Sequence, residues 1–208
     1  GGLNRLDLST NTTTVFRRRV SDSNSIGANG ITSILRTFRG NLLVGTFGGG
    51  LSILRSDGAS FTNLLHSPTT KSTISNDNVI ALYQDSIGDI WVGTENGLNK
   101  FNEITNEFQR FYAERGNPKS ISSDMVWAFH EDRNHDLWLG TNGGGLNRWP
   151  LSSRKSSILE VDHYSANISL PSSNIFGIES DDNGNLWLSH NSGVTKFNPS
   201  TMELHQYG

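Results

Sequence analysis

The stretch DIWVGTENGLNKF, residues 89–101, decides the fold, because close copies of it recur along the chain. The copies are NLLVGTFGGGLSIL from residue 41, DLWLGTNGGGLNRW from residue 136 and NLWLSHNSGVTKF from residue 185. The apolar residues that follow the first letter of each copy are Leu42, Ile90, Leu137 and Leu186, at intervals of 48, 47 and 49 residues. A constant period of this length predicts a protein built from structural repeats.

Two further sets of residues repeat with the same period. A glycine recurs after the phrase at Gly2, Gly50, Gly97, Gly145 and Gly193. An apolar residue recurs before it at Ile26, Ile74, Ile121 and Leu170. Because three independent positions share one period, the repetition is a property of the whole chain.

Each period is predicted to contain four short strands, named A to D. In the second complete unit they are VIALYQ, IWVGT, GLNKF and FQRFY, and the Asp and Gly between A and B are typical of a tight turn. Four short antiparallel strands in about 48 residues predict one blade of a β-propeller. We therefore predict an all-β protein, and the lack of a 3.6-residue period excludes a helical solenoid.

The repeat divides residues 1–208 into one half blade and four complete blades. Strands C and D of a first blade are expected at 1–20, and complete blades at 21–65, 66–113, 114–165 and 166–208. A half blade and four blades do not close a ring in the usual way. We therefore expect the segment to pair with another copy, or to sit beside the missing blades of a larger propeller.

Composition excludes several classes of function. The chain has no Cys, which excludes disulfides, thiolate metal sites and thiol nucleophiles and fits an extracytoplasmic bacterial protein. A net charge of −3 gives no basis for nucleic-acid or anionic-membrane binding. No apolar run reaches the roughly 18 residues of a spanning helix, so we expect no membrane insertion by this segment.

The repeated residues are explained by packing between blades. The strand B tryptophans, Trp91, Trp138 and Trp187, are expected to wedge between neighbouring blades. The third residue of strand A is small in every unit, being Ser33, Ala81, Ala128 or Gly177. The repeat lapses where Leu43 replaces Trp, Thr37 replaces the turn Asp, His135 replaces Gly, and Ser189-His190 replace Gly-Thr.

No motif predicts catalysis, a metal site or a cofactor. The run HEDRNH, residues 130–135, lacks the helical spacing of a zinc protease, since its two histidines lie five apart across a predicted turn. The runs GTFGGG and GTNGGG lack the Gly-Lys-Ser/Thr of a phosphate loop. No Ser lies in a G-x-S-x-G elbow.

A ligand is expected where the D–A and B–C loops gather around the mouth of the channel. Trp127 offers an aromatic platform there, and nearby amides and carboxylates offer hydrogen bonds. The candidate ligand-binding residues are Trp127, Asp77, Asp124, Asn29, Asn174, His190, Glu95 and Asn142. A structural alternative stays open, because Asn and Asp before a strand are also turn formers and Trp127 also suits a core.

The pattern Asp-x-x-Gly-x-x-Trp-x-Gly-Thr-x-x-Gly-Leu resembles the two-component regulator propeller repeat. Residues 85–98 and 181–194 are the best copies, although Ser189-His190 departs from the pattern. The resemblance covers almost the whole chain. It implies a seven-bladed propeller, often one of two in tandem, in the extracytoplasmic sensor part of histidine kinases, hybrid two-component proteins or diguanylate cyclases. It also implies that carbohydrates are frequent ligands.

From these observations we predict a non-catalytic ligand-sensing or interaction domain in the periplasmic part of an inner-membrane protein. The expected partners are a small molecule or oligosaccharide, and other blades or copies. An output kinase or cyclase domain is implied by the resemblance alone. Two alternatives stay open: a propeller glycan lyase or hydrolase, comparable to the streptogramin lyases, and a purely structural interaction scaffold.

Overall fold

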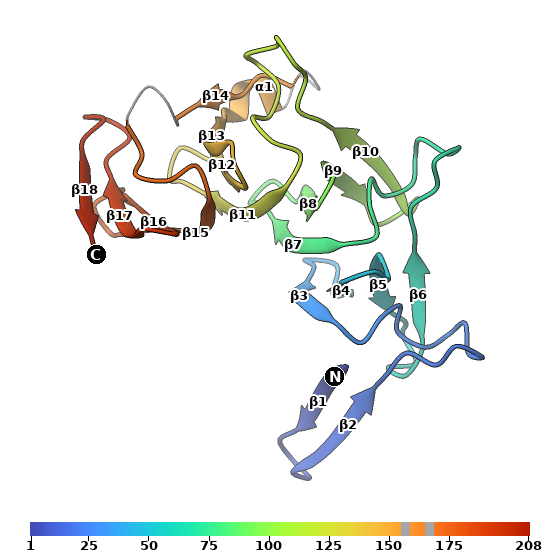
Figure 1. Cartoon of the computed structure of the whole chain (residues 1–208). Helices are drawn as coiled ribbons and strands as arrows, with labels where there is room; N and C mark the ends of the chain where they lie inside the picture. Colours follow the sequence, from blue (N-terminus) through green and yellow to red (C-terminus); the bar gives the residue numbers. More distant parts are fainter. Residues whose placement is uncertain (155–158, 165–168) are drawn as a thin grey trace.

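The chain has an all-β, propeller-like fold. The computed structural model describes residues 1–154, 159–164 and 169–208. Their strands form four antiparallel sheets of four strands each and one two-stranded sheet. The sheets lie side by side along a curve that runs from the N-terminal hairpin to the C-terminal sheet (Figure 1).

The strands are named in chain order. The N-terminal hairpin holds β1 (Leu3–Asp7) and β2 (Thr12–Phe16). Blade 1 holds β3 (Ile31–Arg36), β4 (Leu42–Thr46), β5 (Leu51–Leu54) and β6 (Phe61–Leu64). Blade 2 holds β7 (Val79–Gln84), β8 (Ile90–Thr94), β9 (Gly97–Asn102) and β10 (Glu107–Phe111). Blade 3 holds β11 (Val126–Glu131), β12 (Leu137–Thr141), β13 (Gly145–Trp149) and β14 (Asp162–His163). Blade 4 holds β15 (Ile175–Ser180), β16 (Leu186–His190), β17 (Gly193–Phe197) and β18 (Leu204–Tyr207).

Each blade is a meander in which strands A, B, C and D pair in chain order. The A strands β3, β7, β11 and β15 begin and end at the predicted residues, and they lie on the inner side of the curve (Figure 1). Each A strand carries a bulge at its second residue, where the pairing with strand B shifts register. The bulged residues are Thr32, Ile80, Trp127 and Phe176.

The A–B turn explains why Asp and Trp recur together. In blade 2, Asp85 accepts hydrogen bonds from the backbone N–H of Asp89 and from Nε1 of Trp91, both at 2.8 Å. Asp132 and Asp181 hold the same two kinds of group in blades 3 and 4. The Asp therefore closes the turn and also satisfies the indole donor. Blade 1 has neither the turn Asp nor the Trp, since Thr37 and Leu43 occupy their positions.

The strand B glycines permit the close approach of the next blade. A side chain at Gly93 would collide with the carbonyl oxygen of Val126, and one at Gly140 would lie 2.9 Å from that of Ile175. Both contacts cross from one blade to the start of strand A in the next. The absence of a side chain at these glycines therefore lets neighbouring blades approach closely.

The core consists of separate apolar layers between neighbouring blades, which we call seams. Seam 1–2 contains Leu43 and Leu51 of blade 1 and Val79, Ile90 and Phe101 of blade 2. Seam 2–3 contains Trp91, Leu98, Val126, Leu137 and Trp149. Seam 3–4 contains Trp138, Leu146, Ile175, Leu186 and Phe197. Stability is thus built between blades, as the repeated packing residues predicted.

The C–D link of blade 3 differs from the predicted pattern. It contains a short helix, α1 (Leu151–Arg154), and strand D of this blade is reduced to the two residues of β14. A four-residue helix is too short to produce a recognisable helical period in the sequence. Among the described residues, no helix has the length and apolar character needed to cross a membrane.

Candidate functional site

Three of the candidate residues before strand A have the same local task in successive blades. The side-chain oxygens of Asn29, Asp77 and Asp124 accept backbone N–H groups at 2.7–2.8 Å. The donors are Arg18, His66 and Ala113, each of which lies just after a D strand. These side chains therefore tie the end of one blade to the start of the next.

The other loop residues contact one another around the B–C loops. Asn174 accepts the backbone N–H of Gly143 in the neighbouring blade at 2.8 Å. Glu95 accepts a hydrogen bond from Asn78 at 2.5 Å, and the side-chain amide of Asn142 lies 3.0 Å from Sδ of Met125. Each of these groups is half-buried and has a partner within the protein.

His190 lies at the end of strand B, in the Thr position that the repeat alignment gives it, and not in the loops where a ligand was expected. It is the last residue of β16 and is buried, with 6% of its surface exposed. Its Nε2 lies 2.8 Å from Oγ1 of Thr195, and its Nδ1 accepts the backbone N–H of Ser192 at 3.1 Å. Burial lowers the pKa of this imidazole. His190 thus takes the place that Thr94 and Thr141 hold in the other blades, where their hydroxyls close the same turn.

Trp127 lies on the inner side of the curve, in an aromatic surrounding. Its ring stacks on Phe176 with centroids 4.8 Å apart and an interplanar angle of 25°. It lines a hollow of about 400 Å³ together with Tyr83, Phe129 and Glu179, and the hollow extends to Trp187 and Ser189 of blade 4. The candidate carboxylates Asp77 and Asp124 are not among the residues that line this hollow.

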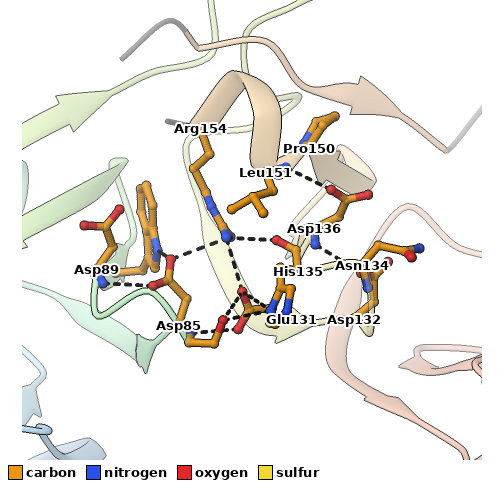
Figure 2. Close-up of polar contacts among 12 residues, drawn as sticks. Asp85, Asp89, Glu131, Asp132, Asn134, His135, Asp136, Pro150, Leu151 and Arg154 are labelled. Carbon is orange, nitrogen blue, oxygen red and sulfur yellow. Dashed lines mark hydrogen bonds and ion pairs between the residues drawn. The ribbon is translucent and has the colours of Figure 1, made fainter. Parts of the chain in front are cut away.

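A polar cluster that sequence reasoning missed lies at the A–B turns of blades 2 and 3. Figure 2 shows the side chain of Arg154 reaching from α1 toward Asp85 of blade 2 and Glu131 of blade 3. The side chains of Arg154 and Asp85 have no exposed surface, and that of Glu131 is 8% exposed. One cation is therefore buried between two carboxylates from adjacent blades.

The distances show which contacts carry the cluster. Nη2 of Arg154 donates to the backbone oxygen of His135 at 2.9 Å and to Oε1 of Glu131 at 3.2 Å. Its Nη1 lies 3.6 Å from Oδ2 of Asp85, which is an ion pair without a hydrogen bond. Glu131 also accepts the backbone N–H of Ser86 at 2.7 Å.

The pKa values of the Asp85 and Glu131 carboxyl groups are shifted in opposite directions. Burial raises the pKa of Asp85, and the hydrogen bond from Trp91 and the charge of Arg154 only partly offset it. Burial also acts to raise the pKa of Glu131, but hydrogen bonds from Ser86 and Arg154 outweigh it, so that this pKa lies below its ordinary value. Glu131 is thus held ionised more effectively than Asp85, with Ser86 contributing more than Arg154.

Ser86, His135 and Glu131 meet here without forming a nucleophile triad. Oγ of Ser86 lies 2.8 Å from Nδ1 of His135, and Oε1 of Glu131 lies 3.5 Å from the same nitrogen. A triad requires the Ser and the carboxylate on opposite ring nitrogens, so that one side orients the imidazole and the other accepts the proton. Because both groups share Nδ1, this arrangement is a hydrogen-bonded turn contact.

His130 and His135 of the HEDRNH run lie in different surroundings. His130 is on β11 with its Nδ1 3.8 Å from Glu179 of blade 4, whereas His135 has a left-handed backbone with φ of 60° in the A–B turn. In the part of the chain that the structure describes, no group of three or more His, Asp and Glu side chains is placed to hold a metal ion.

Sequence contained only a weak signal for Arg154. The C–D link of blade 3 runs from residue 150 to 161, whereas that of blade 2 runs from 103 to 106. The longer link marks an insertion, but its contact with Asp85, 69 residues earlier, depends on how the blades stack.

A family model described as "Two component regulator propeller" matches residues 73–96, 120–143 and 169–192. Each matched segment runs from just before strand A to the end of the A–B pair or the loop beyond it. No curated protein matches the chain.

Solved structures resemble the chain at low sequence identity. Two are extracellular domains of hybrid two-component systems from B. thetaiotaomicron, with identities of 20% and 17% and TM-scores of 0.79 and 0.65. They match 98% and 99% of this chain, which spans 27% and 34% of their own lengths. A third is virginiamycin B lyase from Staphylococcus aureus, with 13% identity, a TM-score of 0.66, and coverage of 98% of this chain and 61% of that one. Identities this low show a shared propeller fold alone.

Proposed function

Because this chain is built of two-component regulator propeller repeats, we propose that it is a ligand-sensing segment in the extracytoplasmic part of a bacterial signal-transduction receptor. The structural similarity to extracellular domains of hybrid two-component systems supports this placement. The segment itself is proposed to be non-catalytic, since Ser86, His135 and Glu131 lack the geometry of a triad.

The hollow at Trp127 is the observation that carries ligand sensing. Stacked aromatic rings on the inner side of a curved array provide a flat apolar platform with polar edges nearby. A sugar ring presents an apolar face to such a platform and hydroxyls to its rim. We therefore propose an oligosaccharide as the ligand class, with Trp127 as the platform and Phe176 stacked beside it.

Calorimetric titration with a panel of defined oligosaccharides tests this proposal. Trp127→Ala is expected to weaken binding by about tenfold or more, the loss that corresponds to roughly 1.4 kcal/mol of contact energy. Thr32→Ala is the matched control, because Thr32 occupies the same bulge in blade 1 and does not line the hollow. Equal binding of an oligosaccharide to both variants would place the site elsewhere.

A second candidate function is supported by the fold of virginiamycin B lyase. A propeller lyase or hydrolase would convert a glycan or cyclic depsipeptide instead of only binding it. Incubating the chain with a panel of both substrate types and following products by mass spectrometry separates the two functions. The Trp127→Ala variant, purified in the same way, is the control. Turnover that is equal in this variant would point to a contaminating enzyme.

We also propose that the free side of blade 4 is covered in the working protein by another blade or by a second copy. Trp187 lies on this side and is only half-buried, and Tyr207 beside it is 45% exposed. Exposed aromatic surface next to open strand edges favours association. Light scattering of the isolated chain is expected to give a mass above 22.9 kDa that increases with concentration. A strictly monomeric chain at high concentration would contradict self-association.

A further inference from the structure

Residues 150–154 make a contact that the repeat does not require. They belong to the long C–D link of blade 3, and their last side chain enters the A–B turn region of blade 2. The shorter C–D link of blade 2 makes a comparable contact with blade 1. Its Glu103, 8% exposed, accepts hydrogen bonds from Thr37 and Asn41 at 2.9 Å. C–D links thus close two successive seams. The link of blade 2 closes seam 1–2 with the negative charge of Glu103, and the link of blade 3 closes seam 2–3 with the positive charge of Arg154.

The segment is anchored at both of its ends. The backbone N–H of Leu151 donates to Oδ1 of Asp136 at 2.8 Å, and Arg148 holds the other oxygen of the same carboxylate. At the far end, Arg154 contacts His135 and Glu131. A helix of one turn has no stability of its own in water, so these two anchors hold it in place.

The far anchor joins two blades through charge. Asp85 belongs to blade 2 and Glu131 to blade 3, and both lie against the buried guanidinium. Without that cation, two carboxylates from facing turns would share a buried site with no counter-charge. Removing one partner of a buried ion pair costs far more than the pair contributes, because the remaining charge stays desolvated.

The anchor is incompletely hydrogen-bonded. Nε and Nη1 of Arg154 are buried and have no hydrogen-bond partner among the residues that the structure describes, and the ion pair to Asp85 is 3.6 Å long. Charge therefore contributes more than hydrogen bonding to holding the guanidinium at Asp85. A group held this way gains hydrogen bonds to water when it leaves, which lowers the free energy of local opening.

We propose that residues 150–154 form a releasable strap that locks seam 2–3, and that withdrawal of Arg154 opens this seam at the A–B turns of blades 2 and 3. In seam 2–3 the relative position of blades 2 and 3 therefore depends on one side chain, that of Arg154. Because Tyr83 and Phe129 cross the same seam and also line the hollow at Trp127, opening the seam would reshape that hollow. The lock itself stands whether or not an oligosaccharide binds there.

Hydrogen exchange of the 208-residue chain tests the strap. Arg154→Met keeps the length of the side chain and removes its charge. We expect amide exchange to accelerate about tenfold or more at both turns of seam 2–3, as expected for local opening around unpaired buried charges. The reporting amides are those of Ser86, Gly88, His135 and Asp136. The turn amides of Thr37 and Gly40 in blade 1 are expected to exchange at the wild-type rate.

Two further variants separate the lock from a general loss of stability. Lys119→Met removes a cation from an exposed ion pair with Asp162 and is expected to leave exchange at the seam 2–3 turns unchanged. Adding Glu131→Gln to Arg154→Met removes one of the two unpaired charges and is expected to restore part of the protection.

Three results would overturn the proposal. They are unchanged exchange at the two turns in Arg154→Met, equal acceleration in all blades, and a double variant that exchanges as fast as the single one. If Arg154→Met does not fold, Arg154→Gln takes its place, because Gln also removes the charge but keeps a polar side chain. Faster exchange confined to the same turns then supports the strap, and wild-type or uniform exchange refutes it.

Discussion

Trp91 and Trp187 hold the same position in the repeat, but Trp91 is enclosed in seam 2–3 and Trp187 lies on the free side of blade 4. The ring of Trp91 is 1% exposed and lies 5.0 Å from that of Trp149, which belongs to the next blade. Trp187 stacks on Tyr207 of its own blade, at 5.3 Å. Both donate a hydrogen bond to the turn Asp. The comparison teaches that the motif builds the turn, whereas burial of the Trp depends on the neighbouring blade.

The same comparison extends to the small residues beside the Trp. In blades 2 and 3 strand B has Gly93 or Gly140, opposite Ala81 or Ala128 of strand A. In blade 4 the pair is reversed, with Ser189 opposite Gly177. The total side-chain volume of the pair is nearly kept, but the larger residue now lies on strand B instead of strand A. Blade 4 therefore presents a different surface from the one that blades 2 and 3 present to their neighbours.

The largest effect that tests this comparison is expected from the enclosed tryptophans. Trp91→Ala and Trp138→Ala should each lower the free energy of unfolding by about 3–5 kcal/mol, because they leave a large cavity in a seam. Urea denaturation followed by circular dichroism measures this loss. Losses below about 1 kcal/mol in both variants would contradict the assignment of these residues to the seams.

A smaller loss is expected when the blade 4 pair is copied into blade 3. Gly140→Ser should cost about 1–3 kcal/mol, because its side chain would meet the backbone and side chain of Ile175 at 2.9 Å. Adding Ala128→Gly removes one of the crowding atoms, at 3.1 Å, and should recover part of the loss. Ser189→Gly on the free side is the control and should change stability by less than about 0.5 kcal/mol. Equal effects at both sites would break the comparison.

Trp187→Ala is expected to cost less than Trp91→Ala in the isolated chain. The half-buried ring loses its stack on Tyr207, a contact of about 0.5–1.5 kcal/mol, together with part of its buried surface. The same denaturation experiment measures the difference. A loss as large as that of Trp91→Ala would show that the side of blade 4 is already covered, and repeating the measurement at several protein concentrations would reveal whether a second copy covers it.

The smallest effect concerns the turn carboxylates Asp181 and Asp85, whose pKa values are expected to be shifted in opposite directions. Hydrogen bonds from Asn185 hold the pKa of Asp181 below that of an ordinary Asp, so its contribution to stability is present above the unfolded pKa and is lost as the pH falls through the folded one. Burial raises the pKa of Asp85, so ionisation there opposes folding, and protonation relieves this penalty as the pH falls. Carboxyl NMR titration should find Asp85 above Asp181. The reverse order would contradict the burial difference between the seam and the free side.

Much of the fold was predictable because local packing repeats. The period, the four strands, the A–B turn and the pairing of Asp with Trp all recur in the sequence, since each blade solves the same packing problem. The candidate ligand residues were less predictable. Asn29, Asp77 and Asp124 are identical in role to one another, and a repeated polar residue before a strand reads equally well as a ligand group or as a turn former.

By itself the sequence determined the all-β class, the period of the repeat and the order of the strands, because these follow from side-chain patterns within one blade. Only the tertiary structure decided which Trp is enclosed and that Arg154 meets Asp85. The physical reason is that these properties arise where two blades face each other. Contacts across a seam join residues that are far apart in the chain and are not equivalent in the repeat, so no period records them.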